Sequence, residues 1–174
     1  MQGGSVDATY GYKVIKDLSV KPKGSVLMLP DYRKQLAEAR ATLPKKLKGQ
    51  GNSAIAHINI EGLNTKTLAG HNQVDIPIGK FVGEGKTEFN SLILPNRKGE
   101  PVDRKTDSEY KIFSNLADQL GSNTQARGQV TIFTERPACP SCLGVAEQFN
   151  KRYPNIKVNI FDNNGKQIKP SGER

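Results

Sequence analysis

Cys139 and Cys142 are the only cysteines among the 174 residues, and they stand where a strand pattern gives way to a helix pattern. The strand pattern runs from Val130 to Phe133, and the helix pattern from Cys139 to Tyr153; a second strand pattern, Ile156 to Phe161, follows. A helix that begins at Cys139 points its free N–H groups and the positive end of its dipole at both sulfurs, an arrangement that favours thiolates. Thiolates bind a metal or exchange disulfides, so two classes of enzyme compete from the start.

The length and net charge of the chain limit how it can fold and which partners it can bind. A chain of 174 residues can bury about two-thirds of its unfolded surface in one core, so neither a disulfide nor a structural metal is needed for folding. The net charge of +9 suits a phosphate-rich partner, an acidic protein or a membrane surface, with a basic solubilising surface as the plain alternative. The apolar run from Val26 to Leu29 is too short to span a bilayer or to form a signal-peptide core. We therefore expect no membrane segment in this piece, which could be the C-terminal part of a longer exported protein.

The composition predicts two regions. Residues 1–50 are interpreted as a linker or N-terminal arm with one possible helix, Asp31 to Leu43, in which Tyr32, Leu36, Ala39 and Leu43 recur at helical spacing. Residues 51–174 are interpreted as the folded domain.

The predicted elements of that domain alternate between strands and helices. Residues 80–105 are expected to form a long loop, and a buried stripe of Ile112, Phe113, Leu116, Ala117 and Leu120 predicts a helix that Gly121 ends. The order β-β-α-β-α-β-β predicts an α/β fold. Its elements are a hairpin of Ala54–Ile60 and Thr65–Ala69, a helix Asp107–Leu120, the strand-helix-strand segment that holds the cysteines, a tight turn Asn163-Asn164-Gly165 and a short last strand around Gln167-Ile168.

A catalytic zinc site needs a third protein ligand besides the two cysteines. His57, His71 and the acidic residues are the candidates, although a histidine inside a strand such as His57 is more typical of a hydrogen-bonded core residue. Two helices on one face of a sheet can bring their N-termini together. Asp107 could then reach a metal held by Cys139 and Cys142, and Glu109 could reach the water bound to it.

Each motif also has a plainer explanation. Thr106-x-x-Glu109 fits a capping box, in which the threonine caps the helix and the glutamate bonds back. An isolated Cys-x-x-Cys is a redox pair as readily as a zinc pair. The order of the two motifs, with one strand between them, favours a shared metal site.

Together, Asp107-Ser108-Glu109 and Pro137-Ala138-Cys139-Pro140-Ser141-Cys142 resemble the motifs of the zinc-dependent nucleoside and nucleobase deaminase superfamily. The likeness is nearest to the deaminase toxin domains of bacterial polymorphic toxins and covers roughly residues 53 to 169. Asp107 stands where the superfamily more often has His or Cys, and Ala138 separates Pro137 from Cys139.

The resemblance implies a cytidine-deaminase-like three-layer sandwich, with a mixed five-stranded sheet, an antiparallel last strand and both motif helices on one face. It implies Zn²⁺ held by Asp107, Cys139 and Cys142, with Glu109 as the proton carrier in the hydrolytic conversion of cytosine to uracil in DNA. Asn72, and also His71, lie just after the second strand, where related deaminases place a residue that touches the target nucleotide. The plainer interpretation of both is a polar loop that caps the hairpin.

The same resemblance implies a biological setting. It predicts a secreted effector domain that acts in the cytoplasm of a target cell, is monomeric, and is neutralised in the producing cell by an immunity protein. Single-stranded DNA, double-stranded DNA, RNA and free nucleoside all remain open as substrates. Six basic residues before the Glu109 helix could track phosphates or simply be solvated: Lys80, Lys86, Arg97, Lys98, Arg104 and Lys105.

Two other functions remain open. Strand, Cys-Pro-Ser-Cys, helix and strand is also the arrangement of a thioredoxin-like thiol-disulfide oxidoreductase that uses Cys139 and Cys142. Against that function, little chain follows Ile160 to supply the further strands and helix of a thioredoxin fold. The other possibility is a zinc-stabilised basic module that binds nucleic acid without catalysis.

Overall fold

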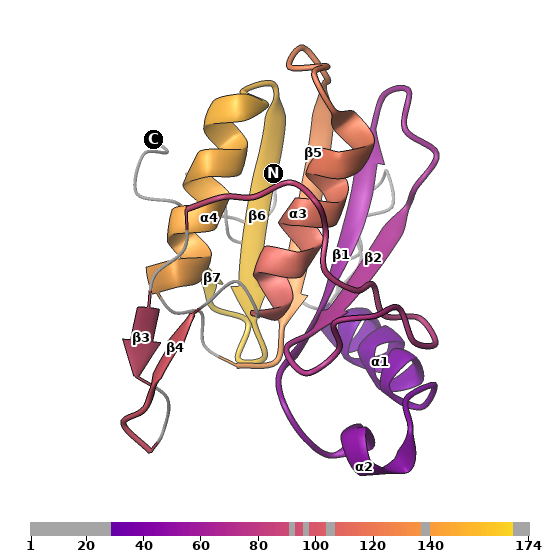
Figure 1. The fold of residues 1–174 in the computed structure, drawn as a ribbon. Coiled ribbons are helices and arrows are strands. Elements are labelled where there is room, and N and C mark those ends of the chain that lie inside the picture. Colours follow the sequence, from indigo (N-terminus) through magenta and orange to yellow (C-terminus); the bar gives the residue numbers. More distant parts are fainter. Residues whose placement is uncertain (1–28, 91–92, 96–97, 104–106, 137–139, 169–174) are drawn as a thin grey trace.

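A mixed sheet forms the middle of the molecule (Figure 1). The computed structural model describes residues 29–90, 93–95, 98–103, 107–136 and 140–168 of the chain. In chain order the elements are α1 (Leu29–Arg40), α2 (Lys45–Lys48), β1 (Ser53–Ile60), β2 (Thr67–His71), β3 (Ile93–Pro95), β4 (Pro101–Asp103), α3 (Ser108–Leu120), β5 (Gly128–Thr134), α4 (Pro140–Arg152), β6 (Ile156–Asp162) and β7 (Gln167–Ile168).

The strand order of the sheet is β2-β1-β5-β6-β7. β5 and β6 are parallel, whereas β1 runs antiparallel to both β2 and β5. Strands of five to eight residues make up the sheet from β2 to β6. β7 adds only two residues to its edge, antiparallel to β6 as the Asn163-Asn164-Gly165 turn predicts. The sheet thus consists of four full strands and one very short edge strand.

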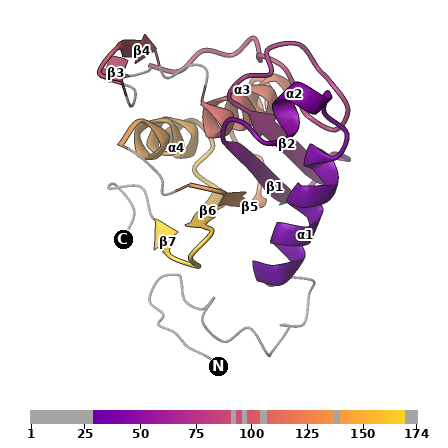
Figure 2. The ribbon, with the colours of Figure 1, turned by 90° about the horizontal axis from the view of Figure 1, so that it is seen from below.

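Helices cover both faces of this sheet, which confirms the α/β class (Figure 2). α3 and α4 pack side by side on one face, and α1 lies on the other (Figures 1 and 2). The two helices that carry the sequence motifs therefore share a face, as predicted. The result is three layers, with the main hydrophobic core between the sheet and the α3–α4 pair.

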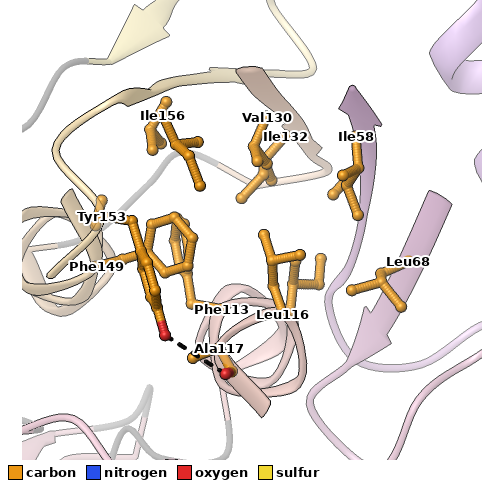
Figure 3. Packing of buried hydrophobic residues seen from close by; sticks show 14 of the residues in the cluster. Ile58, Leu68, Phe113, Leu116, Ala117, Val130, Ile132, Phe149, Tyr153 and Ile156 are labelled. Atoms are coloured by element: carbon orange, nitrogen blue, oxygen red, sulfur yellow. Dashed lines mark hydrogen bonds between the residues drawn. The ribbon is translucent and has the colours of Figure 1, made fainter. Parts of the chain in front are cut away.

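The helical spacing of apolar residues explains how this core forms. Every residue predicted to face inward on α3, and Val145, Ala146 and Phe149 on α4, is buried. All of them belong to one apolar cluster with Val130 and Ile132 of β5, and Figure 3 shows Phe113 and Leu116 of α3 and Phe149 of α4 turned toward that strand. Tyr153 closes the core at the end of α4, where its hydroxyl donates to the carbonyl oxygen of Gly121 at 2.7 Å.

α1 packs more tightly on the sheet than a surface helix would. α1 ends at Arg40, before the predicted end at Leu43. Tyr32, Leu36 and Ala39 of the predicted stripe, and Leu43 just beyond the helix, are buried in a second apolar cluster that includes Phe133 and Phe161. His57 lies on this face of β1 and its Nε2 is 2.6 Å from Gln35 Oε1. His57 is thus a hydrogen-bonded core residue, on the face of the sheet away from α3 and α4. The boundary between residues 50 and 51 stays a prediction, although these contacts join α1 to the sheet of the second region.

The expectation of one long loop over residues 80–105 is wrong in its second half. β3 and β4 form an antiparallel hairpin there, in which Leu94 pairs with Val102. Gly99 permits the turn because its φ is 83°, a value that L side chains rarely adopt. Of the apolar run Leu92 to Leu94, Ile93 and Leu94 belong to this hairpin, and Leu92 lies outside the described residues. Among the described residues, no helix is long and apolar enough to cross a membrane.

Replacing Leu36 by Ala tests whether α1 is part of the folded unit. Leu36 is 2% exposed, so the truncation should lower the free energy of unfolding by about 2–5 kcal/mol. Urea denaturation measures the effect. Lys34→Ala, on the exposed side of α1, is the matched control, and we expect a change within about 0.5 kcal/mol for it. Equal stability of the two variants would mean that α1 does not dock in solution.

Candidate active site

The residues that the sequence singled out lie together at one edge of the sheet, by which we mean the edge formed by strand ends. The pairing of Ser53 with His71, and of Ala54 with Thr134, brings the start of β1 and the ends of β2 and β5 to this edge. The N-terminal ends of α3 and α4 lie at the same edge, at the bottom of Figure 1. We call it the site edge.

The first turn of α3 carries the two acidic candidates. Asp107 is the N-cap of α3, with extended dihedral angles of φ −61° and ψ 146°, and its side chain makes no capping hydrogen bond. Glu109 is therefore the second residue of the helix, not the third, which a capping box requires. A capping box with Thr106 as N-cap would need the helix to begin one residue earlier. Thr106 itself lies outside the described residues.

Glu109 is buried, with 2% of its surface exposed. Carboxylates are almost never buried to this degree unless they are paired or functional. Ser108 Oγ donates a hydrogen bond to Glu109 Oε1 at 3.1 Å. The carboxylate also lies in the first turn of α3, where the helix dipole stabilises negative charge.

The cysteines can be placed only in part. Cys139 lies outside the described residues, and of Cys142 only the backbone is described, in the first turn of α4. No cluster of three or more His, Cys, Asp or Glu side chains suited to a metal occurs in the described part, which leaves out the side chains of both cysteines. The donor types nevertheless fit zinc, because two thiolates and a carboxylate are among its usual ligands. Asp107 and Cys142 stand at the N-terminal ends of two helices on the same face of the sheet, and Cys139 precedes Cys142 by three residues in the sequence.

Asn52 links three of the elements that meet at the site edge. Its Nδ2 donates to Ser108 Oγ at 3.0 Å and to Thr134 Oγ1 at 3.2 Å. Its backbone N–H donates to Asn72 Oδ1 at 2.9 Å. The residue thereby connects the start of α3 to the end of β5 and to the loop after β2. Sequence reasoning missed Asn52 because no local pattern marks it.

An ion pair holds the segment that leads from β5 toward the cysteines. The carboxylate of Glu135, the first residue after β5, binds the guanidinium of Arg40 at 2.7 and 2.8 Å. The other N–H groups of Arg40 donate to backbone carbonyl oxygens, among them that of Gly51 at 2.9 Å. Ser53 pairs with the backbone and carboxylate of Glu135 as well. The chain is thus fixed four residues before Cys139.

Lys111 anchors the loop that follows β2. Its ammonium group is buried and donates to the carbonyl oxygens of His71 at 3.0 Å and Val74 at 2.6 Å, and to Asp75 Oδ1 at 2.8 Å. This contact fixes the segment with Asn72 against α3. A lysine beside the apolar stripe of a helix normally reaches solvent, so no pattern in the sequence indicates this role.

His71 and Asn72 take different positions in that loop. His71 is fully buried; its Nε2 donates to the carbonyl oxygen of Gln50 at 2.9 Å, and its Nδ1 accepts from Gln73 N–H at 3.0 Å. Burial lowers the pKa of His71, which agrees with a neutral ring that has one donor and one acceptor. These contacts suit the plainer role of ordering the loop. Asn72 is half-buried at the site edge, and contact of either residue with substrate stays a prediction.

Comparison with known proteins identifies a family for this arrangement. The model of the Toxin-deaminase family, described as the BURPS668_1122 family of deaminases, matches residues 36–164. This range includes both sequence motifs and the last five residues of α1. No curated protein and no solved structure gives a significant match to the chain.

Replacing Lys111 by Met tests the anchor of the loop after β2. The change keeps the length of the side chain but leaves buried carbonyl groups without their donor. We expect the free energy of unfolding to fall by about 2–4 kcal/mol, and amide hydrogen exchange at residues 71–75 to accelerate. Asp75→Asn is the control: Asp75 is largely exposed, so the charge should contribute at most about 1 kcal/mol. Unchanged exchange in Lys111→Met would contradict the anchoring role.

Proposed function

Because the chain belongs to the Toxin-deaminase family, we propose that it is a zinc-dependent hydrolytic deaminase that converts cytosine to uracil in DNA. Membership of the family makes it a deaminase toxin domain; the base, the polymer and the metal are our proposal. The observation that supports it most directly is the buried carboxylate of Glu109 in the first turn of α3, at the edge where α4 begins and carries Cys142 in its first turn.

Asp107, Cys139 and Cys142 are the proposed ligands of Zn²⁺. When bound, zinc supplies a Lewis acid that makes water nucleophilic near neutral pH. Three protein ligands leave one position open for that water, as catalytic zinc sites do. Asp107 is suited to this role by its position at the N-terminal end of α3, at the edge where α4 also begins.

Glu109 is the proposed acid and base. It accepts a proton from the water that attacks the ring carbon bearing the amino group, and delivers a proton to the adjacent ring nitrogen. A second proton passes through it to the departing amine, so that water is consumed, ammonia leaves and a carbonyl group remains on the ring. Its burial supports this role, because a carboxylate shielded from bulk water exchanges protons with the bound reactants alone.

Asn72 is the proposed contact to the target nucleotide. Its amide oxygen is engaged by Asn52 and its loop is held by Lys111, so the residue has a fixed position beside α3. A fixed position reduces the entropy lost when substrate binds. His71 is assigned to the same site as the residue that orders Asn72.

A basic surface next to this loop supports a polymeric substrate. Exposed lysines Lys45, Lys46 and Lys48 form α2 together with Leu47. His71 bonds to Gln50, just beyond α2, and Lys80 N–H donates to Thr42 Oγ1 just before it. The lysines therefore adjoin the loop that carries Asn72, where they would meet phosphates of a strand whose base enters the site. Of the six basic residues suggested by the sequence, Lys80, Lys86 and Lys98 are exposed, and Arg97, Arg104 and Lys105 lie outside the described residues.

The biological setting follows from the family and stays part of the proposal. A deaminase toxin that acts on DNA would be delivered as a secreted effector to the cytoplasm of a target cell. The producing cell would then need an immunity protein to block the site. We propose that the domain acts as a monomer.

A thioredoxin-like oxidoreductase is not favoured. The family match covers the Cys-x-x-Cys segment together with Asp107 and Glu109, which a redox function leaves unexplained. Within the described residues, only β6 and the two-residue β7 follow α4. Binding of nucleic acid without catalysis is separated from deamination by the first experiment below.

Two substitutions should separate catalysis from metal binding. Glu109→Gln should abolish conversion of cytosine in a DNA oligonucleotide and leave one zinc per chain, because the carboxylate carries protons and does not ligate. Cys142→Ser should lose zinc and turnover together. Metal analysis and sequencing of the treated DNA measure both. Glu61→Gln, an exposed change at the far edge of the sheet, is the control, and turnover by Glu109→Gln at the control's rate would refute the acid-base role.

Salt should separate a DNA substrate from a free nucleoside. If the α2 lysines touch phosphates, kcat/KM on DNA falls steeply with salt, by roughly one power of the salt concentration per contact. The triple change of Lys45, Lys46 and Lys48 to Ala should flatten that dependence. The same change at Lys66, Lys151 and Lys157, which are exposed around the opposite edge, matches it in charge and should have little effect. A salt-independent rate in the unaltered protein would instead indicate a nucleoside substrate.

A further inference from the structure

Ser108 stands between the two acidic residues of the motif, and its side chain is in contact with one of them. It is fully buried. Its hydroxyl donates to Glu109 Oε1 at 3.1 Å and accepts a hydrogen bond from Asn52 Nδ2 at 3.0 Å. A serine hydroxyl has a single proton. Because Asn52 is the donor in its own bond, that proton is directed at the carboxylate.

Asn52 is itself held from several sides. Its backbone N–H and C=O pair with Asn72, and its Nδ2 also donates to Thr134 Oγ1. The amide group therefore cannot turn without breaking contacts to β5 and α3 together. The direction of the bond to Ser108 is thus set by the contacts of Asn52 with β5 and with the loop after β2.

We propose that Ser108, oriented by Asn52, is a positioning residue for Glu109. The hydroxyl holds Oε1 and leaves Oε2 as the oxygen that exchanges protons with the attacking water and the departing amine. This inference rests on the function proposed above. General acid-base catalysis requires heavy-atom distances of about 2.6–3.2 Å, and a carboxylate fixed at one oxygen keeps the other within that range.

The consequence is a loss in kcat with little change in KM. Without the hydroxyl, the carboxylate rotates among several orientations, and only a fraction of the bound complexes can transfer a proton. Removal of comparable supporting hydrogen bonds in active sites costs about 10- to 100-fold in activity. Substrate contacts through Asn72 do not involve Ser108, so KM should stay within about threefold.

Ser108→Ala and Thr134→Val form a matched pair for the test. Both positions are fully buried, and both hydroxyls accept a hydrogen bond from Asn52 Nδ2. Only Ser108 goes on to contact Glu109. Ser108→Ala should lower kcat on a single-cytosine DNA oligonucleotide about 10- to 100-fold at unchanged zinc content, whereas Thr134→Val removes only one of the contacts that hold Asn52 and should lower kcat by a much smaller factor. Asn52→Ala should lower kcat as well, to a smaller extent.

The melting temperature and the zinc content of each variant accompany the kinetics. An unchanged kcat in Ser108→Ala, beside an active unaltered protein, would overturn the positioning role alone. Equal losses of kcat in Ser108→Ala and Thr134→Val would also overturn it, because they would reflect the general stability of the junction. No turnover by the unaltered protein on DNA, RNA or free cytidine would overturn the proposed function and this inference with it.

Discussion

The parallel pairing of β5 with β6 is the constraint on which the rest of the molecule depends. β5 follows α3 and β6 follows α4 in the chain, and both helices pack on the same face of the sheet and run antiparallel to these strands. α3 and α4 must therefore begin at the edge where β5 and β6 end. Two helix N-termini and the Cys-x-x-Cys segment come to one edge for this reason, before any side chain contributes chemistry.

That edge concentrates the polar groups that the fold buries. Ser53, His71, Ser108, Glu109 and Lys111 all lie there, next to a core that is otherwise apolar. Burying such groups is unfavourable unless each finds a partner. The bonds from Asn52 and Lys111 satisfy several of them at once and connect strands that are far apart in sequence. The same bonds fix the geometry of the candidate site, so local stability and the arrangement of that site depend on one network.

The sequence predicted those features whose cause is local. Helical spacing placed the buried stripes of α3 and α4, and the Asn163-Asn164-Gly165 turn placed β7. The contacts of Asn52 span 20 to 82 residues, and no periodic pattern records bonds of that range. The burial of Lys111 could not be predicted, because buried ammonium groups are rare and its partners are carbonyl groups of a loop that is distant in sequence. α1 was expected only as a possible helix in an N-terminal arm, yet its apolar stripe packs into the second apolar cluster on the sheet.

The N-cap of α3 decides how its two acidic residues can act. A helix that began at Thr106 would use Glu109 to bond back to its own backbone. Beginning at Asp107, it puts Glu109 one position earlier, where Ser108 holds the carboxylate instead. The Asp107 side chain does not cap the helix, and the dipole favours negative charge at both positions. The residue at which α3 begins thus decides between two roles for Glu109. With Thr106 as the N-cap it would stabilise the helix end, whereas with Asp107 as the N-cap its carboxylate is held by Ser108 and is available for the proposed proton transfer.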